Sequence, residues 1–449
     1  MRALSLYIPA CRHCIVLGLA LLCSGEIGAA GFALNEMSAA AIGNAFAGSA
    51  AAAEDIGTIY YNPAGLSRMS GRQFMLTGTA LQPSVQFANQ GTLGPAGSPA
   101  TGGNGGDAGS WNAVPSLFYA ADLAPRMRLG IGVYSPFGLK TDYDERWAGR
   151  YQALKSELKT LNLNPTLAYA VNDQFSVGIG VSAQYAKVEL SRAIDFGSVC
   201  AARVGLAACA RGGLLPQGKD GRVTLDGNDW AFGLNLGALY APTPAWRIGV
   251  AYRSAIRHRF SGDARYDKPA GLPALLATAA AFSNTGIEAG LDLPESVNLS
   301  VYRELDSKWS LLGDINWTRW ARFDELRVRF GNGAPDSVLR EDWRNALRLG
   351  LAVNYRYNDA WKLRAGLAFE QSPVKPASRT PSVPDAARRL LAFGAQYKLS
   401  AQSTWDFAYM HIFVSDSDIN RPEPPLGGTL RGRYQNDVNL LSIQYSHAF

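Results

Sequence analysis

The chain has 449 residues and a formal net charge of +6, and 47% of its residues are hydrophobic, 10% aromatic and 18% charged. The charged fraction is below the roughly 25% usual for soluble domains, but the mean hydropathy of −0.06 is too low for a bundle of membrane helices. These values exclude a polytopic helical membrane protein and, because aromatic residues are plentiful, a disordered chain. A large β-rich protein remains, either a soluble sandwich or propeller or an outer-membrane barrel.

The first 29 residues are typical of a secretory signal peptide. Two arginines precede a short apolar run over residues 15–23, and small residues follow at 28–30. Exported proteins carry a charged region, a short apolar region and a small-residue cleavage site in this order. We therefore predict a signal peptide over residues 1–29, with cleavage after Ala29 or Ala30.

Residues 30–70 are rich in Ala, Gly and Ser and show little alternation. The barrel predicted below is wider than side chains alone can fill, and large barrels are commonly plugged. We therefore predict that residues 30–70 form a plug, or hatch, inside a barrel made by residues 71–449. The alternative is a periplasmic tail.

From residue 71 onward, apolar residues alternate with small or polar ones, as in strands that bury one face. In residues 229–242, for example, Trp230, Phe232 and Leu234 share one face. Fourteen such runs occur, near residues 71–88, 113–123, 126–136, 156–171, 174–192, 228–242, 245–260, 291–304, 308–329, 344–358, 361–371, 388–399, 403–415 and 433–449.

The connections between these runs alternate in length. The short ones are 124–125, 172–173, 243–244, 305–307, 359–360 and 400–402, and the long ones are 89–112, 137–155, 193–227, 261–290, 330–343, 372–387 and 416–432. An up-and-down barrel with tight turns at one end and long loops at the other predicts this alternation.

A soluble propeller is the competing fold, but no internal repeat of roughly 40 to 50 residues occurs. Aromatic residues beside the short turns favour a membrane interface instead. They are Phe175, Trp246, Trp309, Trp361 and Trp405, and the last strand ends on Phe449. We predict an all-β fold: a 14-stranded antiparallel transmembrane β-barrel plugged by an N-terminal hatch, in the bacterial outer membrane.

Two cysteines, Cys200 and Cys209, remain after removal of the signal peptide. They lie in a Gly/Ala-rich loop of an exported protein, where a disulfide is favoured over a metal or redox site.

Strand alternation places several basic residues on interior faces, with acids to pair with them. The basic residues are Arg247, Arg253, Arg257, Arg344, Arg348 and Arg364, and the acids are Asp314, Glu370 and Asp406. Most of these arginines are expected to form ion pairs, although a basic interior also suits an anionic amphiphile. The remaining basic residues are scattered, so no nucleic-acid partner is predicted.

An outer-membrane lipase is disfavoured because the chain lacks a Gly-x-Ser-x-Gly elbow. The Gly-x-Gly sequences at 130–132 and 178–180 lie inside strands and lack the third glycine of a nucleotide-binding loop. The chain is therefore predicted to be no enzyme and to need no cofactor. An adhesin or receptor that uses the long loops stays open, whereas a plug argues against an open hydrophilic porin.

Short sequences spread along the chain resemble the FadL/TodX/OmpP1 family of outer-membrane transporters. They are residues 30–36 (AGFALNE), 54–55 (ED), 62–64 (NPA), 135–139 (SPFGL), 147–151 (WAGRY), 162–165 (NLNP), 293–296 (LPES), 317–320 (WTRW) and 384–385 (PD). The resemblance implies a monomeric barrel in outer-membrane lipid that imports long-chain fatty acids or other hydrophobic molecules. Aromatic or aliphatic hydrocarbons are the alternative substrates.

The resemblance also implies roles for particular residues. Phe32 matches an aromatic residue that reaches the ligand pocket, and Asn62, Pro63 and Ala64 match a hatch motif. A kink in the third strand, through which ligand leaves sideways, is matched by Tyr134, Ser135, Pro136, Phe137, Gly138 and Leu139. The residues themselves support a break there, because Pro136 cannot donate to a strand ladder and Gly138 weakens one; an ordinary strand end is the alternative.

Two basic residues are expected from the resemblance to bind the ligand carboxylate. Arg192 matches the first, at the outer end of the fifth strand. Arg340 is the nearest match to the second, in the loop before the tenth strand, although a gap is needed to align it.

Overall fold

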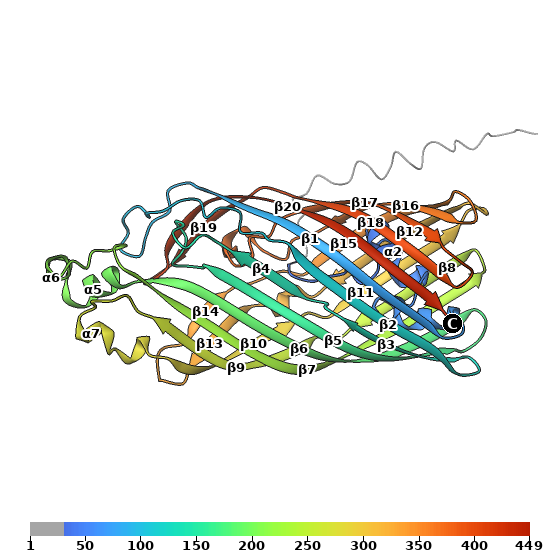
Figure 1. Cartoon of the computed structure of the whole chain (residues 1–449), viewed down its shortest axis with the longest axis horizontal. Helices are drawn as coiled ribbons and strands as arrows, with labels where there is room; N and C mark the ends of the chain where they lie inside the picture. The colour runs from blue at the N-terminus through green and yellow to red at the C-terminus, as the bar shows by residue number, and fades with distance from the viewer. Residues whose placement is uncertain (1–30) are drawn as a thin grey trace, which may run out of the picture.

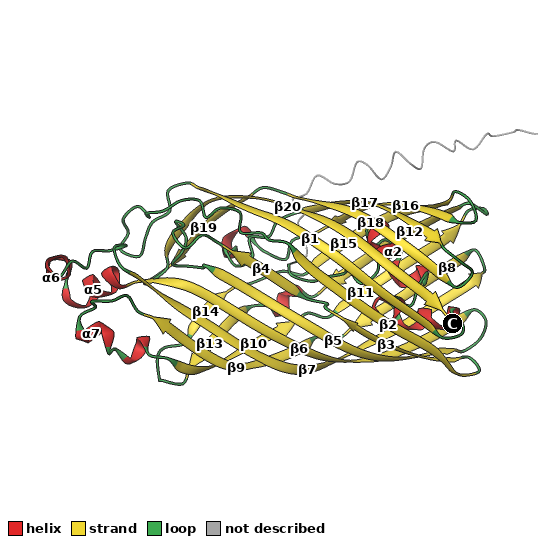
Figure 2. Cartoon of the chain, viewed as in Figure 1, coloured by secondary structure: helices red, strands yellow, loops and turns green. Residues whose placement is uncertain are grey.

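The chain forms one antiparallel sheet that closes on itself. The computed structural model describes residues 31–449, so the predicted signal peptide lies outside the described residues. β1 (Gln73–Asn89) pairs with β2 (Asn112–Ala124) on one side and with β20 (Gly428–Ala448) on the other, which closes the sheet. The prediction of a 14-stranded antiparallel barrel is confirmed (Figure 1, Figure 2).

Six of the fourteen barrel strands are interrupted and consist of two segments. The other continuous strands are β5 (Lys155–Ala170), β6 (Phe175–Asp195), β7 (Asp220–Thr243), β16 (Trp361–Glu370) and β17 (Arg388–Lys398). The interrupted ones are β3 (Met127–Tyr134) with β4 (Gly138–Asp142), β8 (Trp246–Arg253) with β9 (Ile256–Asp267), β10 (Thr285–Leu293) with β11 (Ser296–Glu304), β12 (Trp309–Thr318) with β13 (Glu325–Phe330), β14 (Ser337–Arg340) with β15 (Ala346–Arg356), and β18 (Ser403–Val414) with β19 (Ser417–Glu423).

The wall presents its apolar residues outward. On β7, Trp230 and Phe232 are 58% and 71% exposed. Ala231, between them, and Asn235, further along the strand, are buried in the interior. Successive residues of a strand point to opposite faces, so every second residue meets the surroundings of the barrel. An outward apolar band of this kind fits hydrocarbon and not water.

Two arginines predicted to face the interior, Arg257 and Arg344, are exposed instead. Between β8 and β9 the ladder breaks at Ser254 and Ala255, after which the even-numbered residues face inward. His258 is consequently buried, and Arg257 is exposed with Asp292 as its partner. Because Arg344 precedes β15, it too is exposed, and its Nε donates a hydrogen bond to the main chain of Ser372.

The long connections gather at one end of the barrel and the short turns at the other (Figure 1). We call these the loop end and the turn end. At the loop end lie α5 (Phe196–Val204), α6 (Leu206–Arg211), α7 (Ala274–Ala277), η2 (Ala280–Phe282) and η4 (Pro376–Ser378), while η3 (Trp320–Arg322) divides β12 from β13. Two predicted loops, 330–343 and 416–432, contain the strands β14 and β19. Cys200 and Cys209 form a disulfide that joins α5 to α6.

The N-terminal segment, residues 31–70, contacts strands on many sides of the wall. It contains α2 (Ala39–Gly43), α3 (Ser49–Ala52), α4 (Thr58–Tyr61) and η1 (Pro63–Arg68). α2 packs against β17 and β18, α3 against β8 and β11, and η1 against β5, β6 and β7. Small side chains allow this close approach, and hydrogen bonds fix it: the Ala39 main-chain nitrogen donates to Gln444 Oε1 over 2.9 Å, and that of Ala50 to Ser300 Oγ over 3.1 Å.

Among the residues that the structure describes, no helix has the length and apolar character required to cross a membrane.

Candidate ligand-binding site

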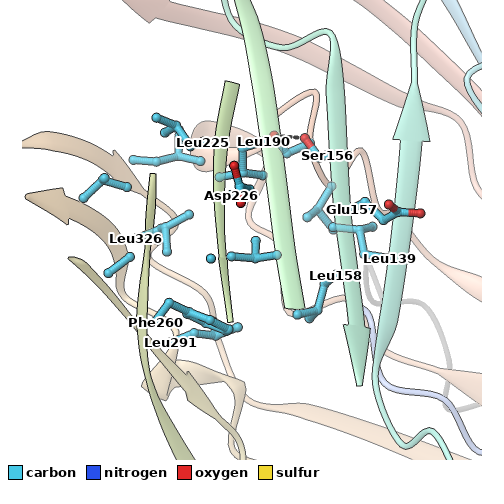
Figure 3. A pocket seen from close by; sticks show the side chains of 18 of the residues that line it. Leu139, Ser156, Glu157, Leu158, Leu190, Leu225, Asp226, Phe260, Leu291 and Leu326 are labelled. Carbon is cyan, nitrogen blue, oxygen red and sulfur yellow. Dashed lines mark hydrogen bonds between the residues drawn. The ribbon is translucent and has the colours of Figure 1, made fainter. Parts of the chain in front are cut away.

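An apolar cavity of about 800 Å³, including the space at its open side, lies in the part of the barrel nearer the loop end. Its apolar lining consists of Phe32, Leu139, Leu158, Val188, Leu190, Leu225, Phe260, Ile287, Ala289, Leu291, Phe323, Leu326, Val328, Leu339 and Val383 (Figure 3). Most come from strands, whose alternation turns every second side chain inward. A concave site with so apolar a lining suits a hydrophobic small molecule.

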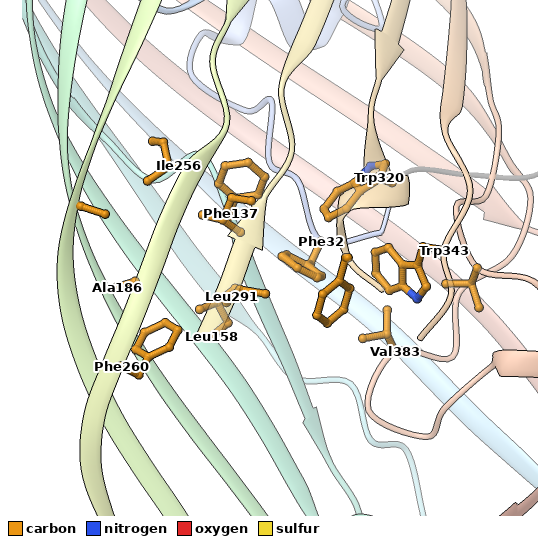
Figure 4. Packing of buried hydrophobic residues seen from close by; sticks show 14 of the residues in the cluster. Phe32, Phe137, Leu158, Ala186, Ile256, Phe260, Leu291, Trp320, Trp343 and Val383 are labelled. Carbon is orange, nitrogen blue, oxygen red and sulfur yellow. The ribbon is translucent and has the colours of Figure 1, made fainter. Parts of the chain in front are cut away.

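Phe32 closes one side of this cavity within a cluster of aromatic rings. Its ring centroid lies 4.8 Å from that of Trp320, 5.6 Å from Trp343, 5.9 Å from Phe323 and 6.2 Å from Phe137 (Figure 4). Three of the four pairs meet edge to face, which is the favoured arrangement of aromatic quadrupoles. Phe32 is only 5% exposed, so its ring separates the cavity from the space beyond.

The main chain around Phe32 is bound to the break between β3 and β4. The Leu34 nitrogen donates to the Pro136 oxygen over 2.9 Å, and the Gly138 nitrogen donates to the Phe32 oxygen over 3.0 Å. Ala33 and Phe137 form an antiparallel bridge. The N-terminal segment thus occupies main-chain groups that a continuous barrel wall would use for its own ladder.

Asp385 and Arg388 hold the residue before Phe32. The Gly31 nitrogen donates to Asp385 Oδ2 over 3.2 Å, and Arg388 Nη2 donates to the Gly31 oxygen over 3.0 Å. Arg388 and Asp385 also form an ion pair at 3.0 Å. These contacts fix the direction in which the Phe32 side chain leaves the main chain.

The barrel wall is incompletely paired beside this break. The last pair between β2 and β3 is Leu117 with Val133, and β4 pairs only with β5. Residues 112–116 of β2 therefore pair with β1 alone within the described chain. Across the break, Thr160 Oγ1 accepts from the Phe137 nitrogen over 3.1 Å and donates to the Phe137 oxygen over 2.6 Å, in place of ladder bonds.

A second void, of about 1600 Å³ including its open sides, lies at this unpaired part of the wall. It is bounded by residues 112–114 of β2 and by residues 137–141. It shares five residues with the apolar cavity, so these residues lie between the two spaces: Phe32, Leu139, Glu157, Leu158 and Val383.

Comparison with known proteins identifies the family of this barrel. Residues 20–449 match the profile of the family described as outer membrane protein transport protein (OMPP1/FadL/TodX). The chain belongs to this family. It is an outer-membrane protein, and members of the family are transporters or channels, not enzymes.

Relatives cover nearly the whole chain. The long-chain fatty acid transport protein of Escherichia coli strain K12 is 30% identical over 446 residues, covering 95% of this chain and 96% of the relative. Outer membrane protein P1 of Haemophilus influenzae is 29% identical, covering 87% and 88%. The crystal structure of a Pseudomonas aeruginosa FadL homologue, 24% identical, superposes with a TM-score of 0.85 over 94% of this chain and all of that one. The Pseudomonas putida toluene transporter TodX, 19% identical, gives 0.66 over 93% and 99%.

In this FadL-family chain, Asn62 joins two parts of the N-terminal segment to the wall. Its Nδ2 donates to the main-chain oxygens of Ala50 and Ala238 over 2.7 and 3.0 Å, and its Oδ1 accepts from the Ala64 nitrogen over 3.1 Å. Pro63 begins η1, a position that needs no main-chain donor. Asn62, Pro63 and Ala64 are buried, and none of them lines the cavity.

Arg192 lies beyond the cavity, at its loop end. Two residues earlier on the same face of β6, Leu190 lines the cavity. Arg192 Nη1 is 3.0 Å from Glu423 Oε1 of β19. Its guanidinium therefore already has a carboxylate partner, which a ligand carboxylate would have to replace.

Arg340 is not brought to the cavity. Leu339 lines the cavity, so alternation along β14 directs the exposed Arg340 away from it. Its main-chain oxygen accepts from Arg421 Nη2 over 3.1 Å, and its side chain forms no ion pair within residues 31–449. The structure therefore does not bring Arg192 and Arg340 together around one ligand site.

Two residues at this site went unnoticed in the sequence. Trp343 belongs to the aromatic cluster, and Glu341 is a buried carboxyl in the cavity lining. Trp343 Nε1 donates to Glu341 Oε2 over 2.8 Å. Burial in apolar surroundings raises the pKa of Glu341 from 4.5 to about 7, against the opposing effect of the Trp343 hydrogen bond. Only the spacing Glu-x-Trp next to an interrupted strand could have indicated this pair.

Two of the arginines predicted in the interior form buried ion pairs, and neither lines the cavity. Arg364 pairs with Asp406 of the wall at 2.7 Å and with Glu54 of the N-terminal segment at 2.8 Å. Arg348 pairs with Asp314 at 2.7 Å. Within residues 31–449 no group of three or more His, Cys, Asp or Glu side chains could hold a metal ion.

Proposed function

We propose that this protein takes up long-chain fatty acids or similar hydrophobic molecules across the outer membrane without an energy source. Ligand is captured at the long loops, moves into the apolar cavity and leaves sideways through the break between β3 and β4 into membrane lipid. Residues 30–70 act as a plug that prevents free passage of solutes. The protein acts as a monomer, because one barrel contains the whole route.

One observation carries this proposal: the apolar cavity and the void at the wall share five lining residues, Phe32, Leu139, Glu157, Leu158 and Val383. Displacement of the Phe32 ring would join the two spaces into one route. Lateral release also avoids a large cost, since re-exposing an alkyl chain to water costs about 0.8 kcal/mol for each CH₂.

The test restores a continuous third strand. In a variant with residues 135–138 replaced by Thr-Val-Thr-Val, we expect surface binding of labelled palmitate to persist and its uptake by a deletion strain to stop. Phe137→Thr is the matched control, since it removes the same aromatic ring but keeps Pro136 and Gly138. Normal uptake by a heat-modifiable, correctly inserted Thr-Val-Thr-Val variant would exclude lateral release.

Hydrocarbon uptake is the second candidate, and it too has a specific observation behind it. Arg192 is paired with Glu423, and Arg340 faces away from the cavity, so no free cationic side chain lines the apolar cavity within the described residues. Comparison of palmitate and hexadecane uptake by one deletion strain, with and without this protein, distinguishes the two. A receptor or adhesin role has less support, since it needs no interior cavity.

A further inference from the structure

The strand break lies at the outer edge of the apolar band. Along the outward face of β5, Leu163 and Leu161 are 43% and 47% exposed, and Lys159 follows as the next outward residue. Lys159 pairs in register with Gly138, the first residue of β4. The opening in the wall is therefore at the level where outward side chains change from apolar to charged, which is where a bilayer changes from hydrocarbon to head groups.

Two lysines stand at the outer mouth of this opening. Lys140 and Lys159 line the void, together with Phe32 on the interior side. Their neighbours Leu139 and Leu158 line the cavity, so alternation directs both lysines outward. Because Lys140 lies opposite Glu157, it is a diagonal neighbour of Lys159, and such pairs are about 7–8 Å apart, within reach of long side chains.

These two ammonium groups have spare capacity to bind an anion. Lys140 forms no ion pair with any residue of the described chain. Lys159 Nζ is 2.8 Å from Glu157 Oε1, but Lys155 Nζ also holds Glu157, at 3.3 Å from Oε2. The Lys159 side chain is 68% exposed, so its remaining donors are open to the surroundings. An ammonium offers three donors, and only one of them is used here.

The chemistry of a departing fatty acid fits this placement. Its alkyl chain gains free energy on passing into hydrocarbon, whereas its carboxylate would lose hydration there at a large cost. The lowest-cost arrangement keeps the carboxylate at the head-group level while the chain enters the bilayer. A pair of ammonium groups at that level would hold it.

We propose that Lys140 and Lys159 form a carboxylate-binding site at the outer mouth of the wall opening, which receives the head group of an anionic amphiphile as its chain moves into the membrane. This inference rests on the proposed lateral release. In this proposal, acids are selected over neutral molecules at the exit. The cavity does not select them, because no cationic side chain of the described residues lines it.

The test compares an acid with a neutral molecule of equal chain length. For Lys140→Gln/Lys159→Gln, initial palmitate uptake by a deletion strain should fall roughly threefold to tenfold, the effect of two partly exposed ion pairs. Hexadecanol uptake should stay as in the parent, because the alcohol carries no charge for the two lysines to bind. Lys140→Arg/Lys159→Arg should restore palmitate uptake, because it keeps both charges.

Lys187→Gln is the matched control, because Lys187 lies directly opposite Lys159 on β6 and does not line the void. Its palmitate uptake should equal that of the parent. Equal loss of palmitate and hexadecanol, loss in Lys187→Gln as well, or no loss in the double variant would each overturn the site. The Thr-Val-Thr-Val variant, measured in parallel, tests lateral release by itself. Lateral release can therefore hold even if the lysine site is wrong.

Discussion

Arg192 of β6 and Glu423 of β19 form an ion pair, 3.0 Å between Nη1 and Oε1, that links two distant strands at the loop end of the barrel. The Arg192 and Glu423 side chains are 31% and 27% exposed, so solvent screens the pair only in part. Leu190 of the same strand face lines the cavity, which places the pair next to the loop end of the cavity.

The pair predicts opposite effects of two substitutions. If Arg192 binds the ligand carboxylate, Glu423→Gln should strengthen palmitate binding, because it removes the competing carboxylate. Arg192→Ala should weaken palmitate binding by about 1.5 to 3 kcal/mol, the range for charged hydrogen bonds, and leave hexadecane binding unchanged. Calorimetric titration of purified variants measures both. Equal losses for the acid and the hydrocarbon would assign Arg192 a purely structural role.

Removal of the Phe32 ring should release the N-terminal segment from the wall. For Phe32→Ala we expect a local loss of about 3 to 5 kcal/mol, as for a buried phenylalanine, with little change in unfolding of the barrel. Hydrogen exchange at the amides of Leu34 and Gly138 reports this, because both bond across the interface of segment and wall. Phe46→Ala, a buried hatch phenylalanine outside the aromatic cluster, should leave the two amides protected. Unchanged exchange in Phe32→Ala would show that the main-chain bonds alone hold the segment.

Glu341 should make stability depend on pH. Because burial raises its pKa from 4.5 to about 7, the folded protein binds more protons than the unfolded chain between these values. The contribution of Glu341 to the free energy of unfolding therefore falls as the pH rises from about 4.5 to about 7. Thermal unfolding in detergent should show the parent losing stability relative to Glu341→Gln over this range. Glu145→Gln is the control, because it removes a loop carboxylate at an exposed position and should not change the dependence of stability on pH. A constant difference between parent and Glu341→Gln would contradict the prediction.

The disulfide should order one loop and leave the barrel unaffected. Cys200 and Cys209 close a short loop that joins α5 to α6. Their joint replacement by serine should cost about 2 to 3 kcal/mol locally through loop entropy and make residues 196–218 more sensitive to protease, with unchanged heat modifiability. Mass spectrometry of unreduced peptides should find the two cysteines linked. Two free thiols in the mature protein would refute the pairing.

The sequence by itself determined the barrel and its number of strands. Alternation with a period of two is a local property, and the alternating loop lengths gave the order of turns and loops. The break at Pro136 and Gly138 was expected from the family resemblance. Its local chemistry, one residue without a donor and one without a side chain, fits an ordinary strand end as well.

Only the tertiary structure decided which side chains meet. The break at Ser254 and Ala255 reverses the inward and outward faces, so Arg257 is exposed although the pattern placed it in the interior. Arg344 is exposed because it precedes β15. Phe32, Trp320 and Trp343 come together from distant parts of the chain, because closure of the sheet and insertion of the N-terminal segment bring them to one side of a cavity. Such contacts depend on which face each strand segment turns inward, on the curvature of the sheet and on its closure. These are properties of the whole barrel, and no local pattern of residues contains them.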